Sequence, residues 1–210
     1  MADLAALTAA IEAGDRTAAT EMTRQAIADG MEPETILAAM TTAMDVVGGK
    51  FQRAEVYVPE MLISARAMKE SVAILEPLLV EGGIKPEFTA IIGTVKGDLH
   101  DIGKNLVAMM WKGANIEVID LGANVAPEVF VAKAREHAAQ LVGVSALLTT
   151  TMVGMKDVVD GIRAAGLTGV RVVVGGAPVT AEFAAQIGAD GYAPDAASAV
   201  ALARRVVAAG

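Results

Sequence analysis

The 210-residue sequence contains no cysteine, which excludes disulfide bonds, thiolate metal sites and cysteine nucleophiles. Aromatic residues make up only 3% of the chain, whereas hydrophobic residues make up 54%, so we expect a core of aliphatic side chains. Positive charge is scarce too, and the net charge of −8 disfavours binding to nucleic acid phosphates. The acidic balance does not exclude a small ligand that carries its own phosphate.

Long apolar runs are also lacking. No uninterrupted apolar stretch reaches the ~18 residues of a membrane span. The N-terminal segment, residues 1–15, has neither the basic start nor the long apolar run of a signal peptide. We therefore expect a cytoplasmic protein with no membrane association.

The first eighty residues have the periodicity of helices, with apolar residues recurring at spacings of three and four. Asp15 and Pro33 are suited to the starts of two of these helices. Pro77, near the end of the fourth helix, is expected to kink or end it. These features predict a four-helix bundle over residues 1–82, followed by a glycine- and proline-containing linker at 83–87.

From residue 88 onward, short apolar runs alternate with helical stretches. The expected strands are 89–94, 116–120, 141–145, 170–174 and 191–192. The expected helices are 102–112, 127–138, 153–165, 181–187 and 196–208. This alternation predicts a flavodoxin- or Rossmann-like α/β domain over 88–210, with a five-stranded parallel sheet covered by helices on both faces. Such folds bind ligands at the carboxyl ends of the strands, where the strand order reverses.

The segment 97–105, GDLHDIGKN, follows the first expected strand. It is not a Walker loop, because five residues rather than four separate its glycines and Asn105 stands where Ser or Thr is needed. It also lacks the G-x-G-x-x-G spacing of dinucleotide-binding folds and the acidic cluster of a receiver domain. What remains is His100 with Asp98 two residues before it. At this spacing the carboxylate can bond to the ring nitrogen that does not face a ligand, which fixes the tautomer.

One histidine without a second histidine or a cysteine nearby makes a poor zinc or iron site. It suits a metal whose equatorial positions are filled by a macrocycle, and both heme and corrin meet this condition. A simple loop hydrogen bond between Asp98 and His100 is the alternative without a ligand. Lys104, at the start of the next helix, is expected to face solvent or a partner rather than a ligand phosphate.

Residues 95–105 resemble the D-x-H-x-x-G signature of cobalamin-binding domains, as found in methionine synthase and in the corrinoid proteins of methylamine, methanol and methoxyarene methyltransferase systems. Two further blocks follow in the family's order. Residues 145–147 match its S-x-L block, with three threonines at 149–151, and residues 175–178 match its Gly-Gly block. Residues 188–196 resemble its closing segment, and 47–51 with 57–61 resemble its helical cap. The resemblance thus covers nearly the whole chain.

The resemblance implies a cobalamin-type corrinoid with His100 as the lower axial ligand of cobalt. Asp98 would bond to His100, and Thr151 would bond to Asp98. Methionine synthase has a serine at this last position, so Thr151 departs from the pattern but keeps the hydroxyl. Ser145 would bond to the buried base of the cofactor, and a slot for its nucleotide tail would be lined by Leu147, Gly175 and Gly176. The other implied cofactor contacts are Asp101, Ile102, Gly103, Thr149, Ala177, Tyr192 and Ala193, with Tyr57, Val58 and Met61 of the cap near the upper face.

The resemblance further implies a methyl carrier and not a complete enzyme, because 210 residues leave no room for substrate modules. The implied partners are a substrate-specific methyltransferase, a second methyltransferase that passes the methyl group to tetrahydrofolate or a thiol, and a reductive activase. Two alternatives stay open. A cobalamin-dependent sensor is disfavoured by the acidic charge, the absence of a basic DNA-binding domain and the absence of tryptophan from the cap. A flavodoxin-like protein without a corrinoid would leave the motif order unexplained.

Overall fold

The computed structural model describes residues 3–83 and 85–209 and divides into two compact units. The first comprises residues 1–86 with 112–115, and the second comprises 87–111 with 116–210. The linker expected at 83–87 includes residue 84, which lies outside the described residues, as do the outermost residues of both expected domains. The boundaries at 82 and 88 therefore stay a prediction.

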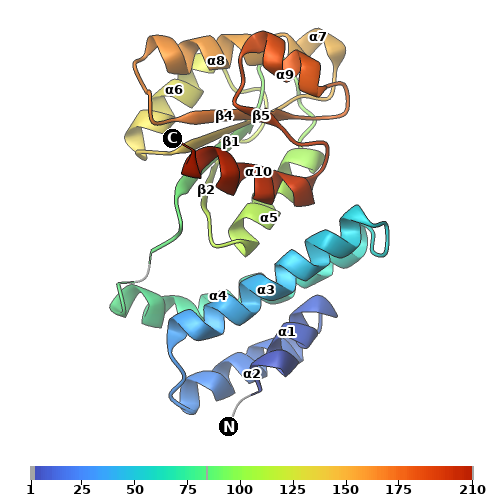
Figure 1. The fold of residues 1–210 in the computed structure, drawn as a ribbon, viewed down its shortest axis with the longest axis vertical. Coiled ribbons are helices and arrows are strands. Elements are labelled where there is room, and N and C mark those ends of the chain that lie inside the picture. Colours follow the sequence, from blue (N-terminus) through green and yellow to red (C-terminus); the bar gives the residue numbers. More distant parts are fainter. Residues whose placement is uncertain (1–2, 84, 210) are drawn as a thin grey trace. The chain divides into compact units, whose positions relative to one another are not determined.

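The first unit consists of α1 (Leu4–Glu12), α2 (Arg16–Ala28), α3 (Pro33–Gln52) and α4 (Val58–Glu81) (Figure 1). Helix α2 packs on α4, α1 on α3, and α3 on α4. Aspartates cap the first two helices: Asp3 accepts a hydrogen bond from the N–H of Ala5 and Asp15 from that of Ala18. The largest fully buried side chains of this unit are aliphatic, as expected: Leu7, Ile11, Ile36, Met40, Met44, Met61, Met68 and Leu75.

Helix α4 does not end at Pro77 but continues to Glu81. A proline disturbs only the turn that precedes it, through its missing N–H and the clash with the carbonyl four residues earlier. Leu79 in the last turn is buried, and this burial favours continuation of the helix. No helix in the described part of the chain is both long and apolar enough to cross a membrane.

The second unit contains a parallel sheet in the order β2-β1-β3-β4-β5. Its strands are β1 (Thr89–Thr94), β2 (Glu117–Asp120), β3 (Leu141–Ser145), β4 (Arg171–Gly175) and β5 (Gly191–Tyr192). Its helices are α5 (Ile102–Gly113), α6 (Pro127–Glu136), α7 (Thr149–Met152), α8 (Met155–Ala164), α9 (Ala181–Ile187) and α10 (Ala196–Ala208). Helices α6 and α8 cover one face of the sheet, and α5 and α10 cover the other (Figure 1). The predicted fold class is confirmed.

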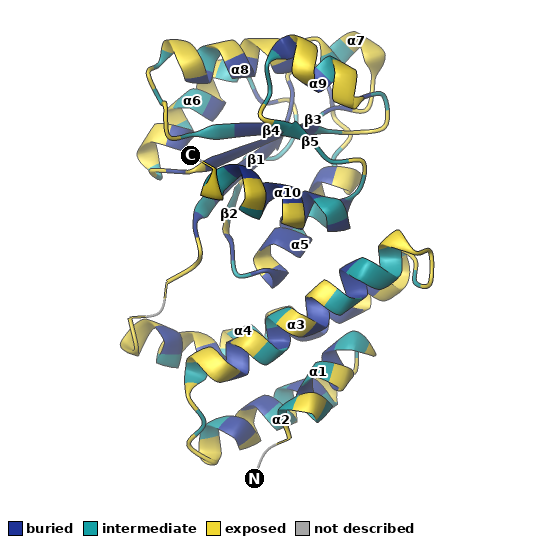
Figure 2. Ribbon diagram, viewed as in Figure 1, coloured by how far each residue is buried: buried dark blue, intermediate teal, exposed yellow. Residues whose placement is uncertain are grey.

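The strands β1, β3 and β4 are the buried centre of this unit, the edge strands β2 and β5 are less buried, and the outward faces of the helices are exposed (Figure 2). Two glycines in the central strands let a large aromatic ring approach each side. A Cβ at Gly93 would lie 2.8 Å from the Phe130 ring of α6, and one at Gly143 would lie 2.7 Å from the Trp111 ring of α5. Both rings are buried, so two of the chain's few aromatic residues serve to pack helices against the sheet.

The segment after β3 differs from the expected single helix at 153–165. A short helix, α7, comes first, and α8 begins only at Met155. The N–H groups of Thr151 and Met152 donate to the carbonyl of Leu148, which starts α7. Threonine is a weak helix former, so the threonine run gives no helical signal in the sequence. The extra turn matters because Thr151 is one of the expected site residues.

Candidate functional site

The candidate site lies at the carboxyl ends of the three central strands. Thr94 at the end of β1 is in register with Ser145 at the end of β3, and Ser145 with Gly175 at the end of β4. The chain crosses from β1 outward to β2 and then returns to β3 on the other side, so the strand order reverses here. The loops that follow these strands carry the three sequence blocks, which the topology thus brings to one edge of the sheet.

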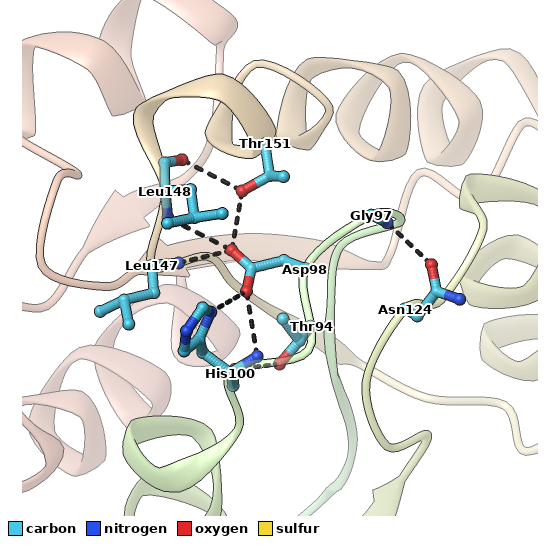
Figure 3. Close-up of polar contacts among 8 residues, drawn as sticks. All are labelled: Thr94, Gly97, Asp98, His100, Asn124, Leu147, Leu148 and Thr151. Carbon is cyan, nitrogen blue, oxygen red and sulfur yellow. Dashed lines mark hydrogen bonds and ion pairs between the residues drawn. The ribbon is translucent and has the colours of Figure 1, made fainter.

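Asp98 is the centre of this arrangement and is fully buried. Its Oδ1 accepts a hydrogen bond from the backbone N–H of His100 at 3.0 Å and lies 2.8 Å from His100 Nδ1 (Figure 3). Its Oδ2 accepts bonds from the N–H groups of Leu147 at 2.8 Å and Leu148 at 3.3 Å, and from the Thr151 hydroxyl at 2.7 Å. One carboxylate therefore ties the loop after β1 to the loop after β3 and to α7.

These contacts decide the charge of the Asp98 carboxyl group. Burial alone raises its pKa, but the hydrogen bonds donated by the backbones of His100 and Leu147, by the Thr151 hydroxyl and by the His100 side chain outweigh burial. The net pKa of Asp98 lies well below its ordinary value. The carboxylate is ionised at neutral pH and can only accept hydrogen bonds, so the facing Nδ1 of His100 must carry a proton.

His100 then presents its other ring nitrogen to the outside. Its side chain is 52% exposed, and within the described residues Nε2 has no hydrogen-bond partner. The backbone is fixed as well, because the carbonyl of His100 accepts a bond from the buried Thr94 hydroxyl at 3.1 Å. In the neutral imidazole, a proton on Nδ1 leaves the lone pair on Nε2, where it can coordinate a metal. The contact with Asp98 and the bond from Thr94 orient this nitrogen.

The surroundings of His100 fit a macrocyclic metal cofactor better than a bare ion. The described residues contain no group of three His, Asp or Glu side chains that could hold a metal. Leu99 and Ile102, on either side of His100 in the chain, are 75% and 77% exposed, and Leu147 is 43% exposed. A single nitrogen donor bordered by exposed apolar side chains suits a large group that supplies the remaining metal ligands itself.

The Gly-Gly block has a steric reason in this structure. Gly176 has a φ of 132°, and a Cβ at this position would overlap the backbone carbonyl oxygen of Ala146. Only glycine therefore allows the loops after β3 and β4 to approach this closely. A Cβ at Gly175 would lie 3.2 Å from the carbonyl oxygen of Ala193, so the loop after β5 is close as well.

The other expected residues of the sheet unit gather at the same edge. Ser145 is the half-buried last residue of β3, Thr149 is the exposed first residue of α7, and Ala177 is exposed two residues beyond β4. Tyr192 ends β5, and the N–H of Ala193 bonds to a carbonyl of β4. Asp101, Ile102 and Gly103 form the junction of the His100 loop with α5.

The three cap residues lie in the helical unit. Tyr57 directly precedes α4 and is 65% exposed, and its N–H donates to the Glu60 carboxylate at 3.0 Å. Val58 is the first residue of α4. Met61 is buried, with 1% of its surface exposed. A role of these three side chains at the cofactor stays a prediction.

Lys104 does not lie where the sequence suggested. It is buried, and its Nζ lies 2.6 Å from both carboxylate oxygens of Asp120 and from Oδ1 of Asn105. The first turn of α5 meets the end of β2, where Asp120 supplies the opposite charge that a buried ammonium group needs. The expectation that Lys104 faces solvent or a partner was wrong.

Sequence reasoning missed two residues that hold the His100 loop. One is Thr94, described above, and the other is Asn124 in the loop after β2, whose Oδ1 accepts a bond from the N–H of Gly97 at 2.8 Å (Figure 3). A weak signal existed for Asn124: it follows a glycine by two residues just beyond a strand, and asparagine tolerates the left-handed conformation that it adopts here.

Comparisons with known proteins agree with this geometry. The B12 binding domain family matches residues 88–201, and a second B12 binding domain family matches residues 4–76. A corrinoid protein of Desulfitobacterium hafniense (strain Y51) is 38% identical over 203 residues, which are 94% of each chain. The dimethylamine corrinoid protein of Methanosarcina barkeri is 41% identical over 181 residues, or 85% of each chain.

Solved structures show the same relationship. A cobalamin-binding protein from Desulfitobacterium hafniense DCB-2 has a TM-score of 0.83 and 29% identity, covering 99% of this chain and all of its own. The methanol:cobalamin methyltransferase complex MtaBC from Methanosarcina barkeri has a chain with a TM-score of 0.84 and 28% identity, covering 99% of this chain and 80% of its own. The alternative of a flavodoxin-like protein without a corrinoid is thereby excluded, and this chain belongs to the corrinoid proteins, which bind cobalamin-type cofactors.

Proposed function

We propose that this corrinoid protein carries a methyl group on cobalt, with Nε2 of His100 as the lower axial ligand. The observation that carries the proposal is the different surroundings of the two nitrogens of the His100 ring. Nδ1 is bound to the ionised Asp98, and Nε2 is unpartnered within the described residues on a half-exposed side chain. A histidine in this state is oriented for a metal before any metal arrives.

The bound cobalt supplies a centre that accepts a methyl group from one molecule and gives it to another. Asp98 keeps the proton on Nδ1 and makes the imidazole a stronger donor, and Thr151 in turn holds Asp98. Ser145 and Leu147 with Gly175 and Gly176 are proposed to receive the nucleotide tail and its base at the sheet edge. The other residues proposed to contact the corrinoid are Asp101, Ile102, Gly103, Thr149, Ala177, Tyr192 and Ala193. Tyr57, Val58 and Met61 of the helical unit are proposed to act as its cap.

The names of the relatives support the first proposed partner, a substrate-specific methyltransferase. They include dimethylamine and trimethylamine corrinoid proteins, and one of the similar solved chains belongs to a methanol:cobalamin methyltransferase complex. We propose that one substrate-specific methyltransferase loads this chain, that a second passes the methyl group to tetrahydrofolate or a thiol, and that a reductive activase restores the cobalt after oxidation. The choice among methanol, methylamines, glycine betaine and aryl methyl ethers is then made by the first partner.

The proposal is tested by loading the purified protein with hydroxocobalamin, removing free cofactor on a desalting column and recording the absorption spectrum. The wild type should retain cobalamin with a spectrum of histidine-ligated cobalt. His100→Ala should lose the cofactor or shift its spectrum. The chain has only two histidines, so His137→Ala, at the end of α6, is a matched control that should behave as the wild type. Retention with an unchanged spectrum in His100→Ala would refute the ligand assignment.

A further inference from the structure

The loop after β2, residues 121–126, is a second support for the His100 loop. Its backbone continues the pairing with β1 beyond the strand ends: the N–H of Thr94 donates to the carbonyl of Gly122 at 3.0 Å, and the N–H of Val125 donates to the carbonyl of Thr94 at 2.9 Å. Val95 and Val125 form an isolated parallel bridge. The loop therefore runs alongside the segment that leads into Asp98 and His100.

Asn124 makes the contacts that reach furthest into this segment. Its backbone N–H donates to the carbonyl of Asp98 at 2.9 Å. Its side-chain Oδ1 accepts a bond from the N–H of Gly97 at 2.8 Å (Figure 3). The two bonds hold the Gly97–Asp98 dipeptide at its two ends, the N–H of Gly97 and the carbonyl of Asp98. Asn124 has a φ of 57°, a conformation that asparagine and glycine adopt more readily than other residues.

Asp98 is thus held on two sides by different elements. Its carboxylate is fixed by the loop after β3 and by α7, and its backbone is fixed by Asn124. The angle at which the carboxylate meets His100 Nδ1 depends on both. Asn124 is neutral and has no bond to the imidazole in the described structure, so any influence that it has on His100 must act through position.

We propose that Asn124 is a positioning residue for the axial histidine: by clamping the Gly97–Asp98 dipeptide it fixes the carboxylate that orients the His100 ring. This inference rests on the proposed role of His100 as the cobalt ligand. Asn124 is exposed, so water competes for its hydrogen bonds, and we expect an effect of a few-fold rather than a complete loss.

Three substitutions separate the side-chain bond from the backbone conformation. Asn124→Asp keeps an oxygen acceptor and tolerates the left-handed conformation. Asn124→Gly keeps only the conformation, and Asn124→Ala loses both. In the apoprotein, amide hydrogen exchange at Gly97, followed by NMR, should be about three- to tenfold faster in Asn124→Gly and Asn124→Ala and unchanged in Asn124→Asp.

In protein loaded with methylcobalamin, the same two variants should release the cofactor about three- to tenfold faster and show a smaller histidine-ligated fraction in the absorption spectrum. Asn124→Asp should restore both readouts. Urea unfolding of each apoprotein controls for general loss of stability, which by itself would not change the ligated fraction.

The outcomes separate this inference from the proposed function. If the wild type fails to retain the cofactor, the proposed function fails, while Gly97 exchange in the apoprotein still tests the clamp. If the wild type is histidine-ligated and Asn124→Gly has the same spectrum and release rate, the positioning role is refuted and the proposed function stands. Equal losses in the Asp, Gly and Ala variants would also refute it, because the acceptor oxygen would then be irrelevant.

Discussion

Replacement of Asp98 by asparagine tests the centre of the site without changing its size. The carboxylate accepts bonds at both oxygens, from His100 at Oδ1 and from Leu147, Leu148 and Thr151 at Oδ2. An amide nitrogen cannot accept, so either the backbone N–H of His100 or that of Leu147 loses its partner. A buried donor left unpaired, together with weaker bonds to the remaining neutral oxygen, should lower the free energy of unfolding by about 2–4 kcal/mol at pH 7.

This difference should shrink in acid, and the sign follows from the lowered pKa of Asp98. The unfolded chain binds a proton at this residue near pH 4, about its ordinary value, whereas the folded protein does so only at lower pH. The stabilisation by the carboxylate is thus complete above about pH 4 and is lost as the pH falls below it toward the folded pKa. Asparagine does not titrate, so the free energies of unfolding of the wild type and of Asp98→Asn should approach each other only as the pH falls below about 4.

The assay is urea unfolding of both apoproteins, followed by circular dichroism at pH 7 and at several values below pH 5. Asp157→Asn is a suitable control, since Asp157 is an exposed aspartate in the first turn of α8 and should change stability by less than about 1 kcal/mol. A loss below about 0.5 kcal/mol for Asp98→Asn at pH 7, or a difference that stays constant down to pH 3, would refute the assigned hydrogen-bond network.

Three further predictions follow from named contacts. In urea unfolding, Gly176→Ala should lower the free energy of unfolding by about 3 kcal/mol or more, because its Cβ meets a backbone carbonyl; Gly166→Ala, with a φ of 70° and open space, should lower it by only about 1 kcal/mol. Thr151→Val should reduce the histidine-ligated fraction of loaded protein, and Thr151→Ser should restore it, as read from absorption spectra; equal behaviour would argue against the hydroxyl bond. Lys104→Met should lower the free energy of unfolding in urea by about 1–3 kcal/mol. The double variant Lys104→Met, Asp120→Asn should lose less than the two single variants lose together, and strictly additive losses would show that the ion pair contributes nothing.

Local patterns in the sequence were enough to predict most of the fold. The positions of β1, β3 and β5 and of α9 and α10 agree with the expected ranges, because strand and helix periodicity is written into consecutive residues. The sequence signal failed where local preference and tertiary context disagree. The threonines of α7 gave no helical pattern, and Lys104, with its charged end, looked like a surface residue until the fold placed Asp120 beside it.

The candidate site divides in the same way. The contact of Asp98 with His100 spans two residues, so its spacing alone suggested it, and the resemblance to cobalamin-binding domains added the hydroxyl of Thr151, 53 residues away. Two further contacts are visible only in the folded chain. The N–H of Leu147 donates to Asp98 from 49 residues away, and the side chain of Asn124 accepts a bond from the N–H of Gly97, 27 residues away. The sequence by itself determined the elements other than α7 and which histidine is paired with an acid, since both are set by neighbours along the chain. The tertiary structure decided which backbone groups meet the carboxylate, because the order of strands in the sheet brings loops together that the sequence keeps far apart.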